Sequence, residues 1–144
     1  MKIYGKRGRG SLGYVNAYIM CSKPEVHDPI RFYVDTGASR TTIADRDAAR
    51  LGLDYEQLEE SQIPVVGIGC KKVKNYLLRD VMVVFRIARD SFHIEALPMV
   101  TVLRNEPQNE EEQKLVDQLP SLLGVDVLEK YNVGFSNKRV ILEK

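Results

Sequence analysis

The sequence predicts a mainly β protein with two or three short helices in one folded domain. Its 144 residues suit a single domain and suffice to bury a hydrophobic core. Apolar residues alternate with polar ones or form short runs, and glycine, proline and asparagine separate these stretches. Helix-type sequence is confined to short segments, so we expect strands to form most of the structure.

The first two strands are expected after a basic N-terminal segment. Residues 1–13 combine glycines with Lys and Arg, and we interpret them as a flexible arm that holds a possible short strand at Lys2–Tyr4. The folded domain is then expected over residues 14–144. Within it, residues 14–20 alternate as a strand does, and residues 30–34 form a second apolar strand.

A short helix and a glycine-tipped hairpin are expected next. Asp45 is a plausible N-cap for a helix that ends near Gly52. From residue 63 to residue 103 the sequence is again of β type. Gly67 and Gly69 stand between apolar residues there and indicate the tip of a hairpin.

The C-terminal third begins with an acidic excursion. Residues 104–119 break the β pattern and predict a solvated loop that runs into a helix, with Leu115, Val116 and Leu119 on one side. An apolar pair, a glycine, a short helix and a last hairpin that turns at residues 136–138 complete the chain.

Composition excludes several classes of function. The 21 basic and 20 acidic residues nearly cancel, so nucleic acid is an unlikely partner and no field draws the chain to a membrane. No apolar run approaches the roughly 20 residues of a membrane span, and no signal-peptide pattern opens the sequence. Cys21 and Cys70 are far apart and in no Cys-x-x-Cys pair, which predicts reduced thiols, no metal site and a cytoplasmic location.

One aspartate is placed in an unusual way. The apolar run Phe32–Val34 leads directly into Asp35, which Thr36 and Gly37 follow. A metal site would need further ligands close in sequence, and phosphoaspartyl enzymes place a second acid or a lysine where Thr36 and Gly37 stand here. The glycines near residue 67 lead to no phosphate-binding Gly-Lys-Ser/Thr, and the Gly-x-Ser-x-Gly pattern of serine hydrolases is absent.

Paired-carboxylate chemistry remains for Asp35. Two aspartates about 3 Å apart share one proton, so one can activate a water while the other polarises a carbonyl group. Gly37 permits a tight turn that presents its N–H to the acid, and the Thr36 hydroxyl can hold the loop by hydrogen bonding.

Three segments in order give the sequence a family resemblance. "VDTGA" at 34–38 resembles the catalytic loop of retropepsin-like aspartic proteases, the single-lobe relatives of pepsin. "VVGIG" at 65–69 resembles the tip of their flap, and "SLLGVDVL" at 121–128 resembles the segment beside their catalytic loop. The resemblance implies a closed, barrel-like β fold. It also implies the site residues: catalytic Asp35, Thr36 and Gly37; substrate-binding Ala38, Gly67, Ile68 and Gly69; and supporting Leu123 and Gly124.

The resemblance further implies a homodimer that acts on polypeptides without metal or cofactor. This chain has one Asp-Thr-Gly where pepsins have two, so the second Asp35 would come from another copy. In the family both chain ends add strands to the dimer sheet, which points to residues 139–142 and 2–4. Ser39 and Val125 replace the Asp and Arg that pair near the retroviral interface, and the helix after residue 44 fits prokaryotic members.

Two functional classes stay open. The first is an active aspartic endopeptidase, and the second is a catalytically silent protease-fold module that dimerises and binds peptide. The intact Asp-Thr-Gly favours the first. Ala38 lacks the hydroxyl of the serine that many aspartic proteases carry at this place, and for the active enzyme we expect a mildly acidic pH optimum.

Overall fold

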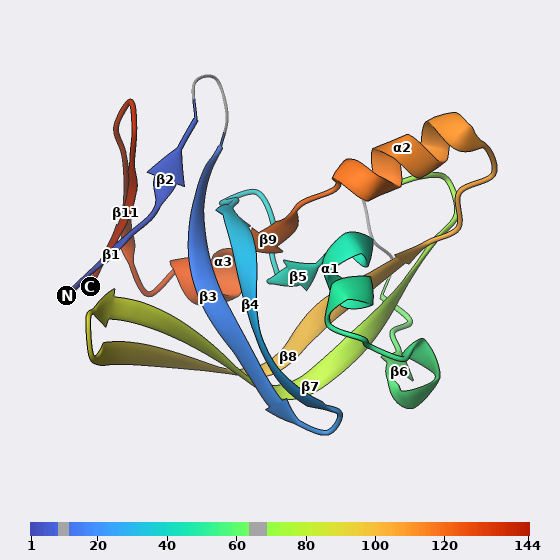
Figure 1. The fold of residues 1–144 in the computed structure, drawn as a ribbon, viewed down its shortest axis with the longest axis horizontal. Helices are drawn as coiled ribbons and strands as arrows, with labels where there is room; N and C mark the ends of the chain where they lie inside the picture. Colours follow the sequence, from blue (N-terminus) through green and yellow to red (C-terminus); the bar gives the residue numbers. More distant parts are fainter. Residues whose placement is uncertain (9–11, 64–68) are drawn as a thin grey trace.

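The computed structural model describes residues 1–8, 12–63 and 69–144, and its architecture is mainly β. Strand β3 pairs with both β4 and β7, so the larger sheet closes into a barrel of six strands in the order β3-β4-β9-β5-β8-β7 (Figure 1). This confirms the predicted mainly β, barrel-like fold. The barrel strands are β3 (Gly13–Ser22), β4 (Glu25–Val34), β5 (Thr42–Ile43), β7 (Val73–Ala88), β8 (Ser91–Asn105) and β9 (Ser121–Leu123).

The β3–β4 hairpin carries the strand that leads to Asp35. Its register runs from Tyr14 opposite Tyr33 to Ser22 opposite Glu25. Alternate residues of both strands point into the barrel, where Ile19 and Phe32 are fully buried. Both strands are longer than predicted, because their outer ends continue the pairing beyond the apolar core.

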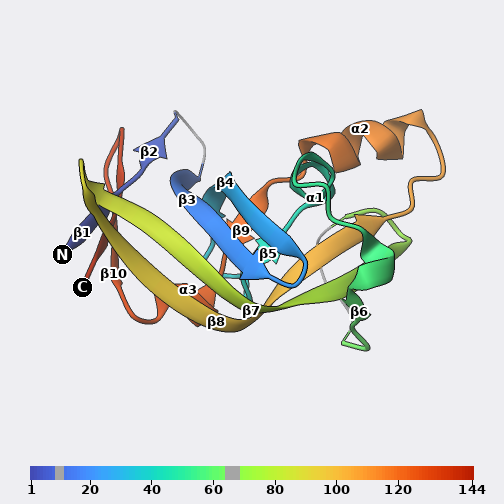
Figure 2. The ribbon, with the colours of Figure 1, turned by 60° about the horizontal axis from the view of Figure 1, so that its bottom comes forward.

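The β7–β8 hairpin is the longest element and forms a curved wall of the barrel (Figure 2). Its inward side chains, such as Leu78, Phe85 and Val100, are fully buried. The β-type sequence between residues 73 and 103 is confirmed. Residues 69–72 form bends and not the strand that the apolar sequence indicated. Strand β6 (Glu59–Glu60) pairs with β7 on the edge of the sheet.

A second, three-stranded sheet joins the two chain ends. Its order is β1 (Lys2–Tyr4), β11 (Val140–Glu143) and β10 (Asn132–Phe135), and Figure 2 shows both termini together beside it. The short strand expected at Lys2–Tyr4 is confirmed. With β2 (Lys6–Arg7) paired to β3, strands take up much of the segment that we interpreted as a flexible arm.

The three helices are short. Helix α1 (Asp45–Arg50) begins after Ala44, so the expected N-cap at Asp45 is wrong by one residue. The carboxylate of Asp45 instead accepts hydrogen bonds from Asn105. Gly52 follows the helix with a φ of 70°, the left-handed conformation that favours glycine at a helix end.

Helix α2 (Glu110–Gln118) is the predicted helix of the acidic excursion, and Asn109 caps it by accepting from the Glu112 N–H. Val116 is buried and Leu119 is half-buried, but Leu115 is 47% exposed, so the expectation that all three lie on one side is wrong for Leu115. Helix α3 (Val125–Leu128) follows β9 as predicted. Across the described ranges, no helix combines the length and the apolar character needed to cross a lipid bilayer.

Candidate active site

Asp35 stands at the point where β4 leaves the barrel. Strand β4 pairs in parallel with β9, with Val34 opposite Leu123, and the Asp35 N–H donates to the Leu123 carbonyl at 3.1 Å. Phe32 and Val34 before it are buried, whereas Asp35 itself is partly exposed. The fold therefore presents a carboxylate to solvent from the end of a rigid, buried strand.

A tight loop follows the acid and turns back toward it. The Gly37 N–H donates to Asp35 Oδ1 at 2.8 Å, which confirms the contact expected from the sequence. The Ala38 N–H donates to the Asp35 carbonyl at 3.2 Å, and the Ala38 carbonyl accepts from the Val125 N–H at 2.8 Å. The main-chain hydrogen bonds thus fix the loop backbone, and the Gly37 N–H orients the Asp35 side chain.

The side-chain lock of this loop differs from the one expected. The Thr36 side chain is exposed, and its hydroxyl makes no hydrogen bond with the described part of the chain. Thr41, which is fully buried, takes this role. Its hydroxyl donates to Asp126 Oδ1 at 2.7 Å and accepts from the Gly124 N–H at 3.1 Å, and its own N–H donates to Asp126 Oδ2 at 2.9 Å.

Gly124 is required by close packing of two backbones. A Cβ at this position would lie 2.4 Å from the carbonyl carbon of Arg40 and 2.8 Å from the nitrogen of Thr41. Only a residue without a side chain lets the β9–α3 connection lie directly against the loop that follows Asp35. Leu123, the preceding residue, is fully buried in the core. Both residues therefore lie against the loop, as their predicted supporting role requires.

The expected flap tip is described only in part. Gly67 and Ile68 lie outside the described residues. Gly69 has a φ of 98°, and a Cβ there would come within 2.2 Å of the Asn105 side-chain oxygen. That same oxygen accepts from the Cys70 N–H at 2.9 Å. Gly69 is therefore fixed against the barrel at the end of β8.

Asn105 is a structural residue that we did not single out from the sequence. It is buried, and its side-chain NH₂ group donates to Asp45 Oδ1 at 2.7 Å. Its side-chain oxygen accepts from the Cys70 N–H. One side chain thus connects helix α1 to the segment after residue 68. No sequence motif marks it, because its partners come from positions 60 and 35 residues away.

The described residues of one chain contribute a single carboxylate to this loop. The Asp35 side chain accepts from Gly37, and no second carboxylate shares a hydrogen bond with it within the described ranges. The same ranges contain no group of three or more His, Cys, Asp or Glu side chains placed to hold a metal ion.

A closed six-strand barrel that carries an Asp-Thr-Gly loop against an apolar-apolar-Gly segment defines the retropepsin-like class of folds. Comparison with known families agrees with this assignment. The family model described as aspartyl protease matches residues 25–127, which include the whole Asp35 loop and the Gly124 segment. The chain belongs to the aspartyl protease family.

Solved structures show the same fold. A retropepsin-like aspartic protease from Rickettsia conorii superposes with a TM-score of 0.59 and 24% sequence identity, over 99% of this chain and 89% of that one. This neighbour is a prokaryotic protein, the kind that the helix after residue 44 indicated. No curated protein matches the sequence significantly.

Proposed function

We propose that this chain is an aspartic endopeptidase whose catalytic pair consists of two Asp35 carboxylates, one from each subunit of a homodimer. The pair shares a proton. The ionised carboxylate takes a proton from a water molecule, and the protonated one donates to the carbonyl oxygen of the peptide bond. Thr36 and Gly37 complete the catalytic loop, and no metal or cofactor is needed for this reaction.

The observation that carries the proposal is the environment of Asp35. Its backbone is fixed by Leu123, one of its oxygens accepts from Gly37, and the side chain remains partly exposed. A carboxylate that only capped its own turn would not need a buried strand beneath it and a second segment packed beside it. This arrangement holds an acid in place while it stays accessible to substrate.

We further propose that substrate lies between this loop and the segment around residues 67–69. Ala38 borders the loop on one side, and Gly67, Ile68 and Gly69 would cover the polypeptide from the other. The close packing of Gly69 against Asn105 would anchor one end of this covering segment to the barrel.

Digestion of a peptide library, with and without pepstatin, tests the activity. Pepstatin mimics the tetrahedral transition state of aspartic proteolysis, so we expect cleavage that pepstatin abolishes. Asp35→Asn should lower the turnover by about 100-fold or more while the protein stays folded, because general acid–base catalysis contributes about that much.

Asp90→Asn is the matched control, because Asp90 is exposed in the turn between β7 and β8. It should cleave like the wild type. Cleavage by purified Asp35→Asn at the wild-type rate would refute the assignment of Asp35. A wild-type protein that binds peptides but cuts none would instead be a silent binding module with a protease fold.

A further inference from the structure

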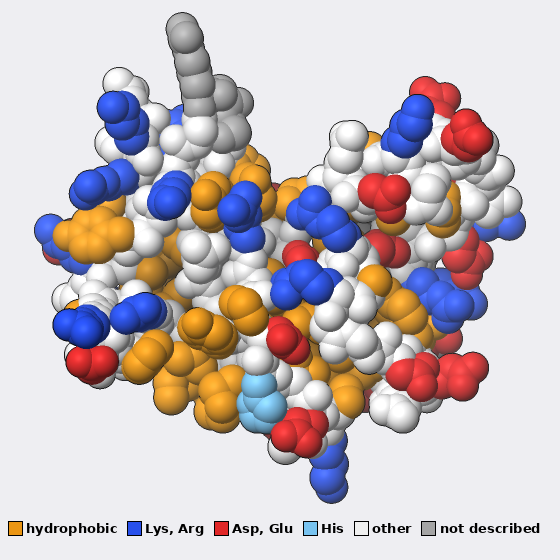
Figure 3. All heavy atoms as spheres, in the orientation of Figure 1, with side chains coloured by type: hydrophobic (Ala, Val, Ile, Leu, Met, Phe, Trp, Pro, Cys, Tyr) orange, Lys and Arg blue, Asp and Glu red, His pale blue; other side chains and the backbone are white. Residues whose placement is uncertain are grey.

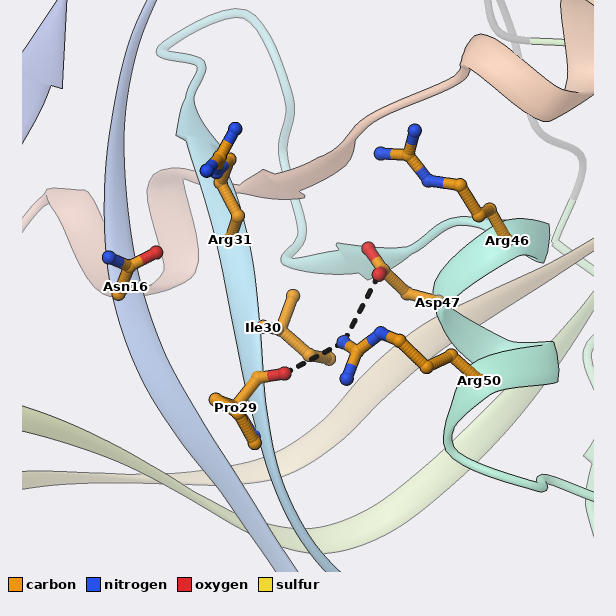
Figure 4. A pocket seen from close by; sticks show the side chains of 7 residues that line it. All are labelled: Asn16, Pro29, Ile30, Arg31, Arg46, Asp47 and Arg50. Carbon is orange, nitrogen blue, oxygen red and sulfur yellow. Dashed lines mark hydrogen bonds and ion pairs between the residues drawn. The ribbon is translucent and has the colours of Figure 1, made fainter.

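A second site lies on the outer face of the barrel, between β4 and helix α1. A pocket of about 340 Å³ opens there, and Figure 4 shows Arg31 of β4 and Arg46 of α1 on opposite sides of it. Asp47 and Arg50 extend from α1 toward β4 below them. Asp35 does not line this pocket, which is therefore distinct from the candidate active site.

The charges around this pocket are not balanced. Three arginines and one aspartate line it. Arg50 is paired with Asp47 at 3.2 Å, whereas neither Arg31 nor Arg46 has a carboxylate within ion-pair distance among the residues that the structure describes. Figure 3 shows Lys and Arg side chains gathered over the region where β4 faces α1. Two positive charges therefore remain available to a ligand.

This concentration of positive charge destabilises the protein when no ligand is bound. Arg46 and Arg50 lie four residues apart on one helix, where like charges repel each other. The repulsion is relieved when an anion binds between the guanidinium groups. A cluster of this kind is therefore better explained by an anionic ligand than by stability of the fold.

The pocket is also held in shape before any ligand binds. Asp47 is buried and accepts from the Ser121 hydroxyl at 2.6 Å, which connects α1 to β9. Arg50 donates to the Pro29 carbonyl at 2.7 Å, and the Arg31 guanidinium stacks on the Tyr14 ring at 4.2 Å. Groups fixed in this way lose little conformational entropy on binding.

We propose that this pocket binds a small phosphate monoester. A phosphate group carries nearly two negative charges at neutral pH and has three oxygens that accept from guanidinium groups on different sides. A monocarboxylate has one charge and presents both oxygens along one edge. The volume is at the lower end of the roughly 300–1,000 Å³ typical of small-molecule pockets, which leaves room for a small organic group beside Asn16 and Pro29.

Calorimetric titration at constant ionic strength tests this proposal. The probes are phenyl phosphate, inorganic phosphate and acetate, and constant ionic strength removes differences in screening. We expect phenyl phosphate to bind at one site per chain, more tightly than inorganic phosphate, with acetate much weaker than both. Arg46→Gln and Arg31→Gln should each weaken the binding of phenyl phosphate by about 10-fold or more, because each removes a charge-assisted contact.

Lys114→Gln on the exposed face of α2 removes one positive charge outside the pocket and is the matched control. It should bind phenyl phosphate like the wild type. Equal weakening in Lys114→Gln, binding without saturation, or acetate binding as tight as phosphate would overturn the proposal. Equal affinity for phosphate and phenyl phosphate would overturn the assignment of an ester. The same titration with Asp35→Asn keeps the result independent of peptidase activity.

Discussion

At the residue scale, the candidate site is held by contacts across long sequence distances. The sequence predicted Asp35 and the contact from Gly37, because both lie within one short motif whose chemistry is local. It did not predict that Thr41 and Asp126, 85 residues apart, hold the end of the same loop. Thr and Asp are common residues, and no spacing rule identifies a pair that only the fold brings together.

Asp126 is expected to act as a positioning residue for Asp35. Asp126→Ala would leave the Thr41 N–H and hydroxyl without their acceptor, at a cost of about 1–3 kcal/mol in the free energy of unfolding. Because the loop would then shift, we expect the turnover number of the proposed peptidase to fall about 10-fold or more with little change in KM.

Asp126→Asn is the conservative control, since its amide oxygen can still accept from Thr41. Most of the stability and turnover should return in this variant. Peptide cleavage and urea unfolding of both variants measure the two effects. An Asp126→Ala protein with wild-type turnover would show that Thr41 does not position the catalytic loop.

At the element scale, the C-terminal strand is already paired on both sides within one chain. The family resemblance pointed to residues 139–142 as a strand of the dimer sheet, with residues 2–4 as a possible second. Strand β11 lies in the middle of the three-stranded sheet, paired with β1 and β10, and Val140 and Leu142 are fully buried. A central strand has no free edge, so the outer edges of this sheet are those of β1 and β10. The sequence predicted the hairpin of β10 and β11 but not the pairing of β11 with β1, because that pairing depends on both chain ends meeting.

A buried carboxylate connects this small sheet region to the barrel. Glu95 on β8 is 4% exposed. Burial alone would raise the pKa of Glu95, but hydrogen bonds from Tyr131, Lys144, His93 and Lys130 outweigh burial and hold this pKa well below its usual range. An acid whose pKa is lower in the folded state stabilises the fold above its unfolded pKa of about 4.3, and this stabilisation is lost as the pH falls further.

Glu95→Gln is expected to change the acid stability of the protein. At pH 7 it should lower the free energy of unfolding by about 3 kcal/mol, because it leaves Lys130 and Lys144 without their shared carboxylate. The difference from wild type should shrink as the pH falls from about 5 to about 3, since Glu95 then becomes protonated in the unfolded wild type while the folded wild type still holds it ionised. Urea unfolding of both proteins across this pH range measures the difference in the free energy of unfolding.

The exposed Glu129 offers a matched control, because Glu129→Gln removes an equal charge outside the cluster. Its difference from wild type should be small at every pH. A Glu95→Gln difference that stays constant down to about pH 3 would mean that ionised Glu95 does not account for the acid sensitivity of the fold.

At the scale of the whole molecule, the family resemblance predicted a closed, barrel-like fold but not which strands close it. The alternating strands and the three family-like segments were enough for a barrel-like aspartic protease fold. The closure through β3 and β7 and the joining of β1 to β11 depend on long-range register, which local patterns do not encode. The sequence also did not predict the proposed phosphate pocket, because Arg31 and Arg46 come together only when α1 packs beside β4.

The proposed homodimer can be tested by mixing subunits. If an active site needs one Asp35 from each chain, a dimer of one wild-type and one Asp35→Asn subunit has a single carboxylate and should be inactive. After equal amounts are mixed and allowed to exchange, random pairing leaves about half of the wild-type subunits in active dimers, and a ninefold excess of variant leaves about a tenth. Activity per wild-type subunit should fall accordingly. Adding Asp90→Asn instead should not lower it. Activity that stays constant at every ratio, with subunit exchange verified by mass spectrometry, would mean that one chain builds the whole site.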